Sequence, residues 1–149
     1  MRTKLVIVLI LLQTITVARV LLASEYLGNN QRSGYTNTAV PPKAALLWTY
    51  KERHAPKTAW PEPFGELQFI DFDYADQVTI DKSKVYFGSS ADHTVRALDV
   101  GSGKEQWVFY TEGPVRFSPA LYKDRLFVVS DDGRLYCLKA SDGSPKDTV

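Results

Sequence analysis

The sequence of 149 residues contains one cysteine, Cys137, and only two histidines. A single cysteine cannot form a disulfide within the chain, and the known zinc patterns need several cysteine or histidine ligands at close spacing. We therefore interpret Cys137 as a small buried residue, because unpaired cysteines are usually buried. A reactive thiol or a bridge to a second chain is the alternative.

The chain also has no excess of charge of one sign. Its Lys and Arg residues number 18 and its Asp and Glu residues 17, so the formal net charge is +1. Domains dedicated to nucleic acids carry a basic face that neutralises phosphates, whereas the basic residues here are scattered along the chain. The composition therefore argues against nucleic acid as a partner, and no acidic run forms a solubilising tail.

Long hydrophobic runs are missing too, except near the N-terminus. Leu5–Leu12 is an unbroken apolar run that follows Arg2 and Lys4, and it is too short to span a bilayer easily. Because the small residue Ala23 closes the segment, residues 1–23 have the layout of a secretory signal peptide. We predict export to the periplasm, the cell surface or the medium. An uncleaved segment, which would place the chain at a membrane, and a buried helix are the alternatives.

Residues 24–73 are predicted to form an irregular entry region before the rest of the chain. Pro56, Pro61 and Pro63 exclude a helix and a central strand around them, because proline lacks the amide N–H that both need. The apolar and aromatic composition of Leu46–Tyr50 predicts one strand within this entry region.

From residue 74 onward, short β-rich runs alternate with turn clusters about every ten residues, which is typical of a sandwich, barrel or propeller. No segment there shows a sustained period near 3.6, so the pattern predicts an all-β fold. The predicted strands are residues 77–80, 85–89, 94–99, 104–110, 115–121, 125–130 and 134–140.

This part of the chain is also repetitive. Ala97–Gly103 corresponds to Cys137–Gly143 forty residues later, and Val85–Phe87 corresponds to Leu126–Val128 at an offset of 41. A unit of about 40 residues with four short strands is typical of a β-propeller blade. We therefore predict that residues 74–149 form a partial β-propeller of about two four-stranded antiparallel blades.

One motif of the first repeat has a specific spacing, Ala97-x-Asp99-x-x-Ser102-Gly103-x-x-x-Trp107. Gly103 permits a tight turn, and Asp99 and Ser102 are suited to hydrogen bonds with the amides of that turn. Trp107 offers a large flat apolar surface. The motif resembles the tryptophan-docking motif of pyrroloquinoline-quinone (PQQ)-like β-propeller repeats. The resemblance implies that Trp107 packs between blades and that the motif is structural and does not bind the quinone.

The second repeat departs from this pattern. Cys137 replaces the alanine, Lys139 replaces the aspartate, and Ser144–Val149 contains a proline and no aromatic residue. We therefore predict that the second blade lacks its fourth strand and is incomplete. Closed rings of this family need seven or eight blades, or about 300 residues. The chain is accordingly expected to be a fragment, and further blades or a partner chain are expected to complete its sheet.

Polar residues outside the motif form no catalytic constellation in the sequence. Asp71–Asp76 is the densest carboxylate cluster, but its spacing matches no calcium loop. Asp132-Gly133 is typical of a hairpin turn, and His93 falls on the position of Gly133 in the other repeat. Three further polar residues have no visible partner for acid–base chemistry, namely His54, Glu62 and Glu66.

Arg116 is the polar residue with the most specific expectation. It follows Gly113-Pro114-Val115 and falls within the predicted strand 115–121, which would be the inner strand of its blade. A packing or salt-bridge role is one interpretation of Arg116. A contact to a ligand in the central channel is the other.

Three functions follow from this interpretation. The first is an exported, non-catalytic PQQ-like repeat that serves as a scaffold or as an interaction surface for a protein or small molecule. The second is the N-terminal part of a quinoprotein oxidoreductase, in which case the resemblance implies PQQ and calcium in other blades and none in this chain. The third is a carbohydrate or peptide binding module around the loop His54–Gly65, in which Trp60 lies.

Overall fold

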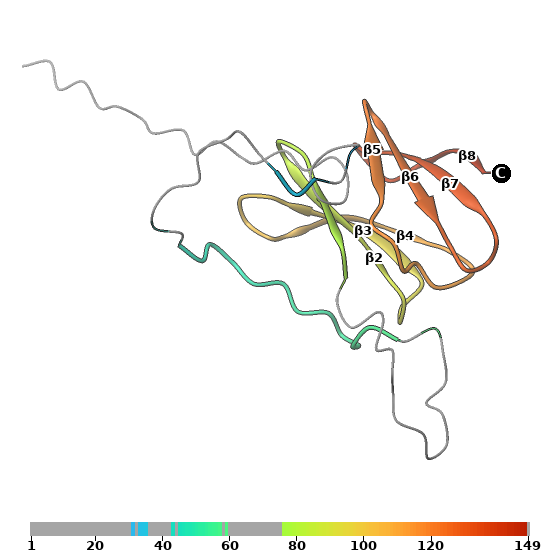
Figure 1. The fold of residues 1–149 in the computed structure, drawn as a ribbon, viewed down its shortest axis with the longest axis horizontal. Coiled ribbons are helices and arrows are strands. Elements are labelled where there is room, and N and C mark those ends of the chain that lie inside the picture. The colour runs from blue at the N-terminus through green and yellow to red at the C-terminus, as the bar shows by residue number, and fades with distance from the viewer. Residues whose placement is uncertain are drawn as a thin grey trace, which may run out of the picture.

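The computed structural model describes residues 31, 33–35, 43, 45–57, 59 and 76–148. Within these residues the chain forms eight β-strands and no helix, and the strands make two four-stranded antiparallel sheets (Figure 1). In the described part no helix is long and apolar enough to cross a membrane. Several predictions fall outside the described residues: the signal peptide over residues 1–23, and the interpretations of Trp60, Glu62, Glu66 and residues 71–75.

The first sheet follows the predicted strands of the first repeat closely. Its strands run in chain order and are β1 (Val78–Ile80), β2 (Lys84–Ser89), β3 (Thr94–Asp99) and β4 (Glu105–Tyr110). In the turn that joins β2 to β3, His93 adopts a positive φ of 56°. Gly133 has a φ of 82° at the corresponding turn of the second sheet, so the two repeats share this turn conformation as well as its place in the sequence.

The second sheet contains a fourth strand, so the prediction that this blade lacks one was wrong. Its strands are β5 (Ala120–Tyr122), β6 (Arg125–Val129), β7 (Leu135–Lys139) and β8 (Pro145–Thr148). Pro145 is the first residue of β8 and lies opposite Leu138, where the register shifts. A missing N–H is tolerated at such a position, and β4 pairs with β3 across an equivalent shift.

Two other predicted strands also differ in the structure. β5 begins at Ala120 instead of residue 115, because Val115 donates its amide to the carbonyl of Ser89 in the first sheet at 3.3 Å, and Pro119 has no amide to donate. Leu46–Tyr50 does not form a strand and pairs with no described strand. This segment is held by its aromatic side chains instead of by its backbone.

The two sheets pack against each other through one buried apolar cluster. Val115, in the connection between the sheets, belongs to it, and Trp107 and Phe109 pack against its edge. Burial of this apolar area is the main force that joins the two blades. The first sheet contributes Tyr86, Val95 and Ala97, and the second contributes Leu126, Val128, Tyr136, Leu138 and Ala140.

The strand registers show which face of each sheet points where. The pair Leu126–Leu138 in the second sheet corresponds to the pair Val85–Leu98 in the first. Leu126 and Leu138 pack against the first sheet, whereas Val85 and Leu98 pack against Trp48 and Tyr50 of the segment that precedes the blades. We call residues 45–57 the lead-in segment, which therefore occupies the place that a preceding blade has relative to the first sheet.

Candidate functional site

The turn between β3 and β4 is built by the first four residues of the docking motif. Gly103 has a φ of 69°, which glycine adopts without strain. Asp99 Oδ1 accepts hydrogen bonds from the amide of Ser102 at 2.8 Å and from its hydroxyl at 2.7 Å. These bonds hold the pKa of Asp99 below its ordinary value. Ala97 is fully buried between the sheets.

Trp48 of the lead-in segment docks on this turn. Its indole Nε1 donates a hydrogen bond to the carbonyl of Val100 at 2.9 Å. A Cβ atom on Gly103 would lie 2.6 Å from Trp48 Cδ2, so only glycine leaves room for the ring. Trp48 thus lies in no strand, contrary to the prediction for Leu46–Tyr50, and serves as a docking residue that no local sequence signal indicated.

Trp107 docks in the same way on the corresponding turn of the second sheet. Its Nε1 donates to the carbonyl of Ala140 at 3.2 Å, and a Cβ atom on Gly143 would lie 2.5 Å from Trp107 Cε3. The Trp107 ring also lies 6.0 Å from the ring of Tyr86, centroid to centroid. The motif thus takes part in two packing contacts: Gly103 contacts Trp48 of the lead-in segment, and Trp107 contacts the turn at Gly143 in the second sheet.

Arg116 lies in the connection between β4 and β5 and not in a strand. Its Nε forms an ion pair with Asp131 Oδ2 at 2.6 Å, and its Nη1 donates to the carbonyl of Lys57. Its side chain is only 10% exposed. Arg116 therefore connects the lead-in segment to the second sheet, and a ligand contact in a central channel stays a prediction.

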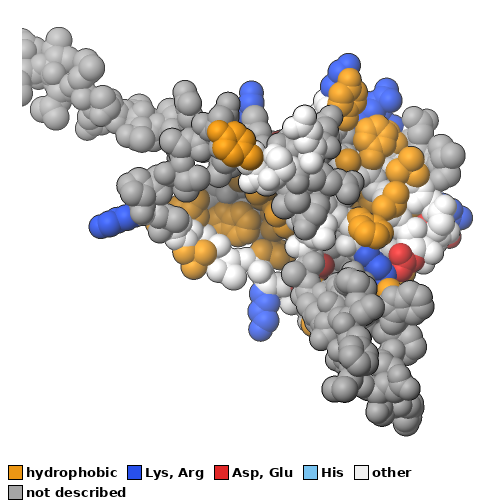
Figure 2. Space-filling view, in the orientation of Figure 1, with side chains coloured by type: hydrophobic (Ala, Val, Ile, Leu, Met, Phe, Trp, Pro, Cys, Tyr) orange, Lys and Arg blue, Asp and Glu red, His pale blue; other side chains and the backbone are white. Residues whose placement is uncertain are grey.

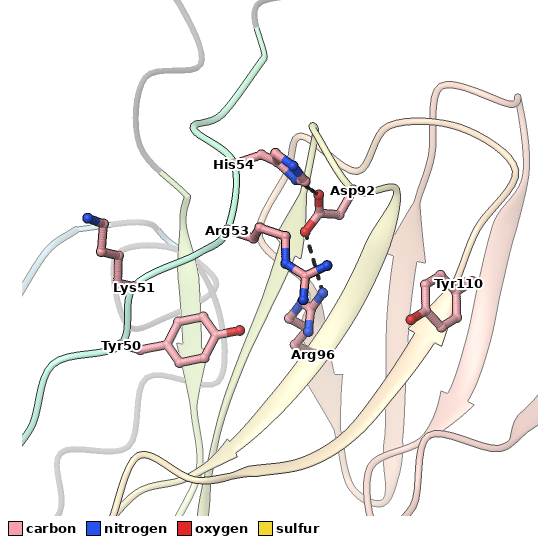
Figure 3. Close-up of a pocket in the computed structure, with 7 residues that line it drawn as sticks. All are labelled: Tyr50, Lys51, Arg53, His54, Asp92, Arg96 and Tyr110. Atoms are coloured by element: carbon pink, nitrogen blue, oxygen red, sulfur yellow. Dashed lines mark hydrogen bonds and ion pairs between the residues drawn. The ribbon is translucent and has the colours of Figure 1, made fainter.

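A pocket of about 670 Å³ opens where the lead-in segment crosses the first sheet. Figure 3 shows Arg53 and His54 reaching from the lead-in segment toward the side chains on the sheet, with the Tyr50 hydroxyl turned toward Arg96. Tyr50 is fixed by an edge-on contact with Phe87, with the ring centroids 5.5 Å apart. The lining residues are Tyr50, Lys51, Arg53, His54, Asp92, Arg96 and Tyr110.

The wall of this pocket is a network of charged side chains. His54 Nδ1 lies 2.6 Å from Asp92 Oδ1, although the sequence offered no partner for His54. Asp92 Oδ2 lies 3.4 Å from Arg96 Nη2, and Arg96 also pairs with Glu105. The side chain of Arg96 is 17% exposed, so the two carboxylates hold a mostly buried guanidinium in place.

Glu52 and Asp76 form a carboxyl pair beside this network. Burial and the neighbouring Asp76 raise the pKa of Glu52 to about 7, and burial also raises the pKa of Asp76. Both Glu52 carboxyl oxygens are buried and have no hydrogen-bond partner among the described residues. A proton on one carboxyl group turns it into a hydrogen-bond donor toward the other, so protonation favours attachment of the lead-in segment to the residues just before β1.

The chain is expected to lose stability as pH rises through the interval that this pair titrates. The folded-state pKa of Glu52 lies above its ordinary value of 4.5, so the folded chain binds the proton more tightly than the unfolded chain. The stabilisation is complete below about pH 4.5 and is lost as pH rises toward about 7. Because Glu52 is partly exposed, we expect a discounted loss of about 1 kcal/mol.

Denaturant unfolding at about pH 5 and about pH 8 measures this loss, with Glu52→Gln as the comparison. Glutamine mimics the protonated acid, so the variant should be about 1 kcal/mol more stable than the natural chain at the higher pH. The two proteins should be equally stable at the lower pH. Equal stability of the two proteins at both pH values would rule out the shared proton.

The described residues contain no cluster of candidate metal ligands. Calcium takes six to eight oxygen ligands, and within residues 31–59 and 76–148, as far as they are described, no three Asp, Glu, His or Cys side chains converge on one point. Glu52 interacts with Asp76, and the Asp92 carboxylate pairs with His54 and Arg96.

Comparison with known proteins gives a family for the two sheets. Residues 74–146 match the model of the family described as outer membrane protein assembly factor BamB. No curated protein matches the chain. Together with the two repeated sheets and their docked tryptophans, the family match shows that this part of the chain consists of PQQ-like β-propeller repeats. The two sheets are two blades of a partial β-propeller.

Three solved structures are similar in part. BamB from Moraxella catarrhalis is 22% identical, with a TM-score of 0.45, over 48% of this chain and 23% of that one. A europium-containing methanol dehydrogenase is 19% identical, with a TM-score of 0.46, over 52% and 15%. Quinohemoprotein alcohol dehydrogenase from Comamonas testosteroni is 27% identical, with a TM-score of 0.45, over 52% and 13%. The matched region thus spans less than a quarter of each of these proteins.

Proposed function

We propose that the chain is an exported, non-catalytic PQQ-like repeat segment that acts as an interaction surface, through the face of the second blade that points away from the first. Four residues on strands β6 and β7 form this face, and we call them the outer face: Phe127, Val129, Leu135 and Cys137. Export is supported by the layout of residues 1–23, with its basic start and apolar run.

The main support for this proposal is that the strands of the two blades pair in the same register. The cross-strand pairs Phe127–Cys137 and Val129–Leu135 correspond to Tyr86–Ala97 and Gly88–Val95 of the first blade. In the first blade all four of these residues are buried against the second blade. The outer face therefore has the positions and the apolar chemistry with which one blade receives the next.

The outer face is only partly covered. Val129 is 46% exposed and Leu135 is 41% exposed, although both are apolar strand residues. Figure 2 shows apolar side chains gathered at the surface over the second sheet. Contiguous exposed apolar side chains mark interaction sites, so we infer that a further blade or a partner chain covers this face.

Sedimentation of the purified chain, compared with Val129→Lys, tests the proposal. The natural chain should self-associate through the outer face, and the lysine should weaken this association at least tenfold because a buried unpaired charge costs several kcal/mol. Val78→Lys is the matched control, since Val78 is 44% exposed on β1 of the other sheet and should leave association unchanged.

Titration with PQQ and Ca²⁺ tests the non-catalytic part of the proposal. Under this proposal we expect the chain alone to bind neither, and among the described residues no group of three or more acidic, His or Cys side chains is placed to hold calcium. A chain that stays monomeric at all concentrations, or one that binds the quinone tightly, contradicts the proposed function.

A further inference from the structure

We propose that the pocket between the lead-in segment and the first sheet binds a ligand that carries a carboxylate next to an aromatic or apolar group. The inference rests on the proposed function of the chain as an interaction protein. It concerns the opposite side of the first blade from the second blade, so it can be tested separately from the outer face.

Cationic side chains outnumber carboxylates among the residues that line the pocket. Three lining side chains are cations, namely Lys51, Arg53 and Arg96, and Asp92 is the single carboxylate among the seven lining residues. Arg96 is already paired with Asp92 and Glu105. Arg53 is exposed and forms no ion pair with any described residue. A guanidinium in this state is ready to bind a carboxylate through two parallel hydrogen bonds.

The same lining favours a singly charged anion. Asp92 is part of the wall, and Glu52, Asp76 and Glu105 lie in the same network. These carboxylates offset most of the positive charge of the lining, so a second negative charge on the ligand gains little, whereas the planar guanidinium of Arg53 matches the planar carboxylate in shape. The pocket should therefore prefer the monoanion.

The size of the pocket and its two tyrosines indicate that the ligand is larger than a carboxylate alone. A volume of about 670 Å³ is within the range of pockets that hold whole organic ligands and is larger than one carboxylate needs. Tyr50 and Tyr110 provide flat surfaces beside the cations (Figure 3). Tyrosines of this kind pack against aromatic or apolar groups while their hydroxyls stay accessible for hydrogen bonds. An acidic side chain of a peptide with a neighbouring aromatic residue fits, and so does a free aromatic carboxylate.

Fluorescence anisotropy with the full chain tests this inference. The probe is a fluorescein-labelled peptide in which glutamate alternates with tyrosine, and the matched peptide has glutamine in place of glutamate. The glutamine peptide and the Arg53→Ala variant should each weaken binding at least tenfold, because each removes the paired charge-assisted hydrogen bonds between Arg53 and the carboxylate. Lys82→Ala is the control, because Lys82 is an exposed cation in the β1–β2 turn, outside the pocket.

Competition identifies the source of the carboxylate. Free hydroxyphenylacetate that displaces the probe at the same concentration as unlabelled peptide assigns the pocket to a small molecule, and failure to displace it assigns the pocket to a peptide. The inference is overturned if the glutamine peptide binds as tightly as the glutamate peptide, if Arg53→Ala behaves like Lys82→Ala, or if inorganic phosphate competes better than the carboxylate. Val129→Lys should leave probe binding unchanged, and Arg53→Ala should leave self-association unchanged.

Discussion

Replacing Trp107 with alanine should lower the free energy of unfolding by about 3 kcal/mol, the low end of the range for large-to-small aromatic substitutions. The substitution removes the ring from the Gly143 turn and from Tyr86, and it deletes the hydrogen bond to Ala140. Because Trp107 is half-buried, we expect the low end of that range. Urea unfolding followed by far-ultraviolet circular dichroism measures the change.

Trp107→Phe separates the two contributions of this side chain. Phenylalanine keeps an aromatic contact with the turn but loses the Nε1 donor and part of the apolar ring area, so the loss should be about 1–2 kcal/mol. Trp48→Ala is the second comparison, since it removes one contact of the lead-in segment and leaves the contact between the blades intact. A loss below about 1 kcal/mol for Trp107→Ala would show that the apolar cluster alone joins the blades.

Replacing Gly88 with alanine should destabilise the chain by about 2–3 kcal/mol. Gly88 lies on β2, and a Cβ atom there would be 2.2 Å from Cγ1 and 2.8 Å from Cβ of Val115. Val115 is 1% exposed in the cluster between the sheets, so it cannot turn into solvent. The blades must separate slightly or the connection before β5 must shift, and both lose packing.

A double-mutant cycle locates the source of this loss. Val115→Ala removes the methyl group that the new Cβ meets, so the double variant should be more stable than the sum of the two single losses predicts, by about 1 kcal/mol. Gly101→Ala is the matched control, because a Cβ at Gly101 meets only Asp99 Oδ1 at 3.5 Å and should change stability by less than about 0.5 kcal/mol. Additive losses from Gly88→Ala and Val115→Ala would contradict the steric origin.

Much of the blade architecture could be predicted from the sequence because its signals are local. The strands of the first repeat depend on residues close together in the chain, and the equivalence of His93 with Gly133 follows from the repeat of about 40 residues. Pro145 shows the limit of this approach. By itself the proline argues against a strand, yet it starts β8, because the register shift at Leu138 places it where no amide is needed.

The candidate site could not be predicted, because its parts are far apart in the sequence. Glu52 meets Asp76, and His54 meets Asp92, only once the lead-in segment lies across the first sheet. Trp48 stands in an apolar, aromatic run that favours a strand. Its role as a docking side chain depends on the turn at Gly103, 55 residues later in the chain.

The sequence by itself determined that this part of the chain is a repeated all-β unit with a tryptophan-docking motif, because periodic strands and turn residues act over a few positions. Only the tertiary structure decided which turn each tryptophan occupies, which face of the second blade is left partly exposed, and which charges gather in the pocket. Those features depend on how one blade packs on its neighbour. Such packing is a property of contacts between segments that no local pattern contains.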